Sequence, residues 1–184
     1  MFDRKSAIQA AALDVFVERG YSAATIAEIG RRSQSTVGSI YHAFDGKAGM
    51  ARTIWTQAVA HWHLEQYKDD KPRKAIRATL EAYLTWGAAN RGAYRLYDEI
   101  VVRAGSEPEF APLAQDIAEY DAAAARVYQA WRAQKLVRKM DWPLASGLIY
   151  GPAAEFLRKE GTVTPEIIEK LAHLAWLGVK VNKS

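Results

Sequence analysis

The spacing of apolar residues in the C-terminal half is the feature that most constrains the fold. Apolar residues recur there at intervals of four and three, at Leu113, Ile117, Tyr120, Ala124, Val127 and Trp131. This period places all six on one face of a helix, whereas a half-buried strand would alternate every second residue. Because no segment alternates for long enough to indicate a strand, the sequence predicts an all-α fold.

The same period divides the rest of the chain into about nine helices. The first four are expected near residues 4–19, 26–32, 36–42 and 45–67. The later ones are expected around the apolar positions of residues 76–87, with an end near Asn90, and of residues 94–101, 113–131, 144–152 and 167–178, the last opening at Pro165. The helix over residues 45–67, which joins the N-terminal helices to the rest of the chain, is expected to be continuous. Its residues Ala51, Ile54, Trp55, Ala58 and Trp62 form one apolar stripe. We therefore expect an N-terminal domain, residues 1–46, and a larger helical bundle, residues 47–184.

Composition excludes several kinds of site. The 184 residues include no cysteine, so disulfides and thiolate–zinc sites are ruled out. No run of eighteen apolar residues occurs, and the first residues lack the apolar core of a signal peptide, so a cytoplasmic location is expected. The net charge of +4 permits binding to a polyanion without requiring it.

Three helices at the N-terminus, the middle one short and with a tight turn before the third, predict a helix-turn-helix. Gly20 is suited to ending the first, and Thr25 with Glu28 has the form of a capping box that starts the second. A polar break at Ser33-Gln34-Ser35 leads to a third helix from Thr36 to His42. In such a motif the third helix enters the major groove of DNA with its N-terminal end.

The third helix has the residues that this role requires. Small or polar side chains at its N-terminal end let the backbone approach the bases, and Val37 suits contact with a thymine methyl. Arg4 and Lys5 are candidates for backbone or minor-groove contacts, while Ile40 and Phe44 are expected to point inward. The predicted DNA-binding residues are Thr25, Ser35, Thr36, Val37, Gly38, Ser39, Tyr41, His42 and Lys47.

Two runs in this segment, Gly20 to Ile29 and Gly38 to Phe44 followed by Gly46-Lys47, resemble the signature of the TetR family of bacterial repressors. The resemblance covers about residues 4–50. It implies a DNA-binding domain followed by a helical domain that dimerises and senses a small molecule. Three positions depart from the family pattern: Gln34-Ser35 replaces Gly-Val, Ala43 replaces His or Tyr, and Gly46 replaces Ser or Thr.

Aromatic residues are concentrated outside the first fifty residues, which contain none of the six tryptophans. Core packing explains most of them, but a pocket for an apolar or planar ligand would have such a lining. The candidate ligand-binding residues are Trp62, Tyr83, Trp86, Tyr97, Phe110, Tyr120 and Tyr128.

The last two helices are candidates for a homodimer surface, with Leu144, Leu148, Leu171 and Leu174 as apolar area beside small residues. Specific binding then requires two copies on a palindromic operator. The function expected is a repressor released by a small apolar or aromatic ligand. The alternative is a small-molecule-binding helical protein without specific DNA activity.

No catalytic residues, cofactor or metal site is predicted. His61 and His63 are two positions apart, so a regular helix would point them to different sides. Tyr94, Tyr97, Asp98 and Glu99 are accompanied by no nucleophile with a positioned base. The sequence therefore favours a regulator over an enzyme.

Overall fold

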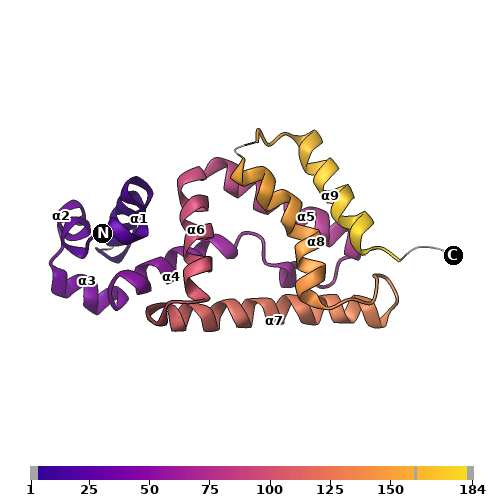
Figure 1. Ribbon diagram of the computed structural model, residues 1–184, viewed down its shortest axis with the longest axis horizontal. Coiled ribbons are helices and arrows are strands. Elements are labelled where there is room, and N and C mark those ends of the chain that lie inside the picture. The colour runs from indigo at the N-terminus through magenta and orange to yellow at the C-terminus, as the bar shows by residue number, and fades with distance from the viewer. Residues whose placement is uncertain (1–3, 160, 182–184) are drawn as a thin grey trace. The chain divides into compact units, whose positions relative to one another are not determined.

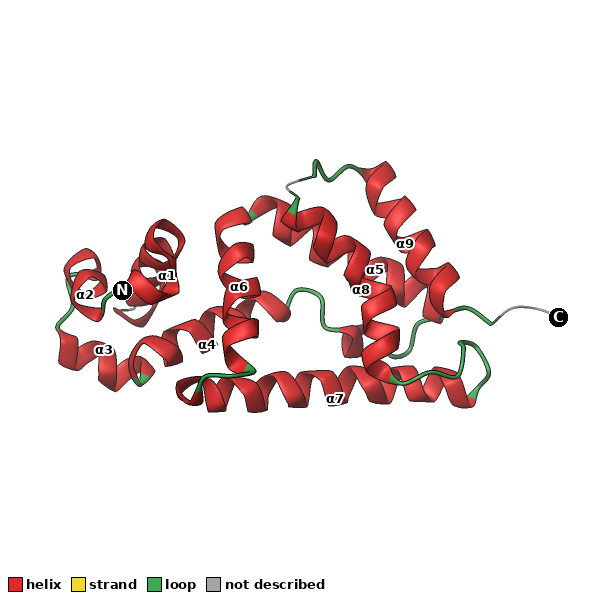
Figure 2. Ribbon diagram, viewed as in Figure 1, coloured by secondary structure: helices red, strands yellow, loops and turns green. Residues whose placement is uncertain are grey.

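The structure is a computed structural model that describes residues 4–159 and 161–181. This part of the chain forms nine α-helices and two short 3₁₀-helices and contains no β-strand, only an isolated bridge between Val137 and Lys180 (Figure 2). The all-α prediction is confirmed. The elements are α1 (Arg4–Ala23), α2 (Ile26–Ser33), α3 (Val37–Phe44), α4 (Gly46–Val59), η1 (Leu64–Tyr67), α5 (Pro72–Ala89), α6 (Arg91–Ala104), η2 (Pro108–Phe110), α7 (Ala111–Ala133), α8 (Trp142–Arg158) and α9 (Pro165–Val179).

Contacts divide the chain into two compact units. The first unit comprises residues 1–59 and 90–116, and the second comprises residues 60–89 and 117–184. The first unit therefore contains α1 to α4 together with α6, and the second contains α5, α8 and α9 (Figure 1). Within the described residues, no helix is long and apolar enough to cross a membrane.

In the first unit, the predicted inner face of the first helix is buried. Ile8, Ala12, Val15 and Phe16 are each at most 2% exposed. The helical assignment of α1 runs on to Ala23, but Gly20 has non-helical angles, φ 75° and ψ 160°, so the regular helix ends where the sequence predicted. Helix α6 packs against α1, which brings a segment seventy residues away in sequence beside the N-terminal helices.

In the second unit, α5 packs against both α8 and α9, and α8 packs against α9. Helix α5 buries Ile76, Leu80 and Tyr83 as predicted. Helix α9 turns Ile168, Ala172, Ala175 and Val179 inward. Its larger neighbour Leu174 is 55% exposed, and on α8 Leu144 is 60% exposed, so both helices present leucines outward.

The prediction of one continuous helix over residues 45–67 is wrong. Helix α4 ends at Val59, and the chain passes through a turn before η1 begins at Leu64. At this break, the Thr79 hydroxyl of α5 donates to the backbone carbonyl of Trp62. Contact with a distant helix thus replaces the backbone bond that a continuing helix would supply, although the apolar period runs on through the break.

Candidate DNA-binding site

The turn between α2 and α3 is tight and has a defined start and end. The Thr25 hydroxyl accepts from the Glu28 amide at 3.2 Å and caps α2, as predicted. Its own proton stays available to donate to a phosphate. Gln34 ends α2 in the left-handed conformation, φ 52°, that glycine adopts at least cost. This explains why the family pattern prefers glycine here and shows that Gln34 accepts some strain to make the same turn.

Helix α3 begins as predicted, with Thr36 as its N-cap, and extends to Phe44 rather than His42. The Thr36 hydroxyl accepts from the Ser39 amide at 3.1 Å and lies 2.9 Å from the Ser39 hydroxyl. Only one proton is used between these two hydroxyls, so the other can donate to DNA. The cap therefore fixes the leading end of α3 and leaves it able to form hydrogen bonds.

The two sides of α3 differ as a DNA-reading helix requires. Ile40 and Phe44 are buried, as expected, and anchor the helix. Val37 is 47% exposed and Tyr41 is 53% exposed, and His42 is exposed beside them. The exposed residues recur four apart and so lie on one face of the helix. Thr25, Thr36 and Gly38 are also exposed, whereas Ser35 and Ser39 are partly buried.

The junction of α3 and α4 is closely packed. Asp45, where the next helix was expected to begin, instead ends α3 in the left-handed conformation with φ 56°. Gly46 follows with φ +89°, and a Cβ there would lie 3.2 Å from Cε1 of Tyr41. The departure from Ser or Thr at this position therefore has a structural reason. At Gly49, a Cβ would lie only 1.5 Å from the carbonyl oxygen of Phe44, so only glycine fits.

Lys47, a predicted phosphate contact, has partners within the protein. Its ammonium donates to the carbonyls of Tyr21 at 2.9 Å and Ala24 at 3.3 Å. It also lies 4.3 Å from the centre of the Tyr21 ring, a favourable cation–π distance. These contacts satisfy carbonyls at the end of α1. A phosphate contact, which remains a prediction, would have to compete with them.

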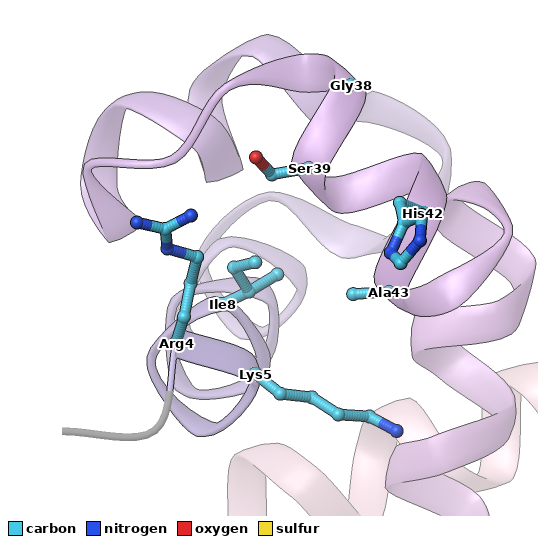
Figure 3. A pocket seen from close by; sticks show the side chains of 7 residues that line it. All are labelled: Arg4, Lys5, Ile8, Gly38, Ser39, His42 and Ala43. Carbon is cyan, nitrogen blue, oxygen red and sulfur yellow. The ribbon is translucent and has the colours of Figure 1, made fainter. Parts of the chain in front are cut away.

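Arg4 and Lys5 lie in the first turn of α1, next to α3. Together with Ser39 and His42 they line an open pocket of about 500 Å³ (Figure 3). Figure 3 shows the first-turn cations on one side of this pocket and the α3 residues on the other. Two cationic side chains beside α3 form a suitable binding site for a DNA phosphate.

The acidic residues Glu18 and Glu28, on α1 and α2, form ion pairs with arginines. Arg32 donates to both Glu18 oxygens and pairs with Glu28 at 3.1 Å, and Arg19 lies 2.8 Å from Glu28. The hydrogen bond from Arg32 lowers the pKa of Glu18. Residues 1–50 carry six Lys or Arg and five Asp or Glu, a small excess of +1. Glu18 and Glu28 are paired with arginines of α1 and α2. The positive charge beside α3 therefore comes from Arg4 and Lys5, and not from a large net charge of residues 1–50.

The segment 90–116 contributes residues that the sequence did not indicate. The Tyr21 hydroxyl donates to Glu109 at 3.2 Å, and the Tyr21 ring lies 5.0 Å from that of Phe110. Arg103 of α6 donates to the Ser22 hydroxyl at 2.6 Å and is held by Glu99. Burial raises the pKa of Tyr21, so its hydroxyl stays protonated. The end of α1 is therefore tied to α6 by residues more than seventy positions away.

The predicted ligand-binding residues fall into separate groups. In the second unit, the Trp62 ring lies 5.1 Å from Tyr83 and 5.2 Å from Trp86, while Tyr120 packs on His63 at 4.3 Å. Tyr128 is buried apart from these and donates to the Arg138 carbonyl at 3.0 Å. In the first unit, Tyr97 stacks with Tyr94 and Phe110 packs on Tyr21. Trp62, Tyr83 and Trp86 are thus the three that form one cluster.

In the part of the chain that the structure describes, no group of three or more His, Asp or Glu side chains is placed to hold a metal ion.

Comparison with known proteins agrees with this geometry. Residues 8–54 match the family model described as bacterial regulatory proteins, tetR family. No curated protein is significantly similar in sequence.

Solved structures share the fold at low identity. A TetR family transcription regulator from Marinobacter aquaeolei VT8 is 16% identical, with a TM-score of 0.78 over 97% of this chain and 96% of that one. A bacterial regulatory protein of the tetR family from Rhodococcus RHA1 is 21% identical, with a TM-score of 0.71 over 100% of both chains. The ketosteroid transcriptional regulator of Mycobacterium tuberculosis is 17% identical, with a TM-score of 0.70 over 99% of this chain and 97% of that one.

The family model spans α2 and α3 and most of α1 and α4, and the fold of the whole chain matches regulators of the same family. The N-terminal helices form a helix-turn-helix that matches the model of the tetR family of bacterial regulatory proteins, and the whole chain has the fold of solved regulators described as members of that family.

Proposed function

We propose that the protein is a cytoplasmic repressor that binds a palindromic operator as a homodimer and is released by a small apolar or aromatic ligand. The observation that carries the DNA-binding part is the leading end of α3, capped by Thr36 and exposed at Val37, Gly38 and Tyr41. A helix of this kind needs no rearrangement of its own to enter a major groove.

We assign the contacts to DNA by chemistry. Val37, Gly38 and Ser39 face the bases, where a methyl contact and a hydroxyl distinguish base pairs. Thr25, Tyr41 and His42 bind the phosphates and set the register, with Ser35, Thr36 and Lys47 beside them. Residues 1–46 thus read DNA, and residues 47–184 sense the ligand and dimerise.

The dimer is proposed to form through α8 and α9. Leu144 and Leu148 of α8 and Leu174 and Leu177 of α9 are exposed large apolar residues. A Cβ at Gly147 or Gly151 would meet no atom within 4 Å, so α8 leaves room for a second copy. A two-fold axis through this face would bury the leucines against one another in an isologous interface.

The ligand is proposed to be apolar because the second unit is rich in aromatic residues, above all Trp62, Tyr83 and Trp86. One protein with a similar fold is a ketosteroid transcriptional regulator, so polycyclic compounds are the first candidates to test. A coupling of about 1–3 kcal/mol would change operator affinity by roughly 5–150-fold.

Selection of random DNA duplexes by the purified protein tests the proposal. Recovery of one palindrome with half-sites about 34–36 Å apart is the expected result. Light scattering should give twice the mass of the chain, and the recovered palindrome should then be used to screen ligands for release.

Two results would exclude the proposal. Retention of duplexes with no common sequence, with steep salt dependence, would indicate an architectural DNA binder. Ligand binding without any DNA affinity would instead indicate a small-molecule-binding helical protein.

A further inference from the structure

Helix α4 ends at a place where its own sequence does not require an end. Residues 60–67, Ala-His-Trp-His-Leu-Glu-Gln-Tyr, contain neither glycine nor proline, and the next proline is Pro72. The apolar stripe of α4 also continues to Trp62 at helical spacing. Local sequence therefore permits a helix through Tyr67, and something outside the segment causes the break.

Two side chains donate to backbone carbonyls at the break. The amide group of Gln66 donates to the Ala60 carbonyl at 2.7 Å, and the Thr79 hydroxyl donates to the Trp62 carbonyl. In a continuous helix these carbonyls would accept from the amides of Leu64 and Gln66. Instead, the Gln66 amide donates to His63 at 3.0 Å as part of η1.

Thr79 is held in place by a second helix. It is fully buried, and its hydroxyl lies 3.0 Å from the hydroxyl of Tyr150 on α8. Because a carbonyl can only accept, Thr79 gives its single proton to Trp62, and Tyr150 must donate to Thr79. Burial raises the pKa of Tyr150 to about 12, so the phenol keeps the proton that it donates. We call the chain of bonds from Tyr150 through Thr79 to the Trp62 carbonyl the latch.

The broken form and a continuous helix satisfy the same two carbonyls with different donors. The latch and Gln66 favour the break, and the packing of the Trp62 ring between Tyr83 and Trp86 adds to it. Helix propagation favours continuity, because each residue added to an existing helix gains a backbone bond. Opposed preferences of this kind make a segment sensitive to small changes.

The segment also occupies a boundary in the fold. The chain passes from the first unit to the second between Val59 and Ala60. We propose that residues 60–67 are a helix–coil switch, broken when the latch is closed and continuous with α4 when it opens. A ligand that draws the Tyr150 hydroxyl away from Thr79 would open it. The link to operator release rests on the proposed function, but the switch itself does not.

Hydrogen exchange of the full-length protein, read by mass spectrometry without DNA or ligand, tests the switch. Thr79→Val replaces the hydroxyl that donates to the Trp62 carbonyl with a methyl group of similar size. Gln66→Ala removes the exposed side chain that donates to the Ala60 carbonyl. In both variants we expect amides of residues 64–67 to exchange roughly two- to tenfold more slowly, as expected for loss of one net hydrogen bond from the broken form. Because Gln66 is exposed, its variant remains informative if Thr79→Val folds poorly.

Thr56→Val is the matched control, because the Thr56 hydroxyl donates to the Arg52 carbonyl within α4, at 2.9 Å. It should leave exchange of residues 64–67 unchanged. Unchanged or faster exchange in Gln66→Ala, and in Thr79→Val if it folds, would overturn the switch, since the segment would then have no helical alternative.

The recovered palindrome then separates the two proposals. Thr79→Val and Gln66→Ala should both shift operator affinity at least about threefold in the same direction, and Thr56→Val should not. Slower exchange with unchanged operator affinity would overturn the regulatory role of the switch. Failure to recover any palindrome would overturn the proposed function, while the exchange result would still decide the switch.

Discussion

Replacing Gly49 by alanine adds one methyl group at the junction that orients the reading helix. The new Cβ would lie 1.5 Å from the backbone carbonyl oxygen of Phe44, whereas ordinary contact begins near 3.4 Å. The carbonyl must therefore retreat by about 2 Å, because no rotation of a side chain can relieve a clash with backbone. This movement also disturbs the bond from the Asp45 amide to the Tyr41 carbonyl, which is 2.9 Å long.

The magnitude follows from three contributions to the free energy of unfolding. Overpacking costs about 1–3 kcal/mol, and the strained hydrogen bond costs about 0.5–1.5 kcal/mol. Alanine in a helix interior offsets about 1 kcal/mol of this. We expect Gly49→Ala to lower stability by about 2 kcal/mol, a large part of the roughly 5–15 kcal/mol that holds a domain folded.

Urea unfolding followed by circular dichroism measures this loss, at equal protein concentrations because a dimer's stability depends on concentration. Gly38→Ala is the control, since the nearest atom to its new Cβ is 4.0 Å away. The control should be up to about 1 kcal/mol more stable and yet bind DNA more weakly, because its methyl group would stand between α3 and the bases. A Gly49→Ala protein as stable as the control would refute the reasoning.

Three further predictions concern the reading face, the dimer and acid stability. Tyr41→Ala should weaken binding to all DNA sequences about equally, whereas Val37→Ala should change base preference at one position, by roughly 1–3 kcal/mol in competition assays. Leu144→Glu should shift the protein towards monomer in light scattering and weaken operator binding, while the wild-type helix content is kept. The pKa of Glu18 is depressed in the folded protein by Arg32, so this pair stabilises above the ordinary carboxyl pKa of 4.5 and is lost as pH falls below it. Arg32→Gln should therefore flatten the loss of thermal stability measured from about pH 5 downwards, and an unchanged slope would contradict the assignment.

The starts of α2, α3 and α9 were predictable because their determinants are local. Thr25, Thr36 and Thr164 each accept from an amide three residues later, and the sequence places a suitable residue at each position. The exposed face of α3 was equally predictable, since Ile40 and Phe44 recur at helical spacing and their neighbours are small or polar.

The partners of the site residues were not predictable, because they lie far away in sequence. Lys47 binds carbonyls of residues 21 to 24, and Arg103 and Glu109 come from the segment 90–116. The sequence around these residues does not show whether a charged side chain contacts another helix or is exposed to water.

The amino-acid sequence alone determined the helical class and the exposed face of α3, because period, capping and turn conformation act over three or four residues. Tertiary structure decided where α4 stops and which helices stand beside the N-terminal domain. Thr79 ends α4 from seventeen residues beyond Trp62, and α6 reaches α1 across more than sixty residues. A carbonyl is satisfied equally well by a backbone amide or by a distant hydroxyl, and only the folded chain settles which donor it meets.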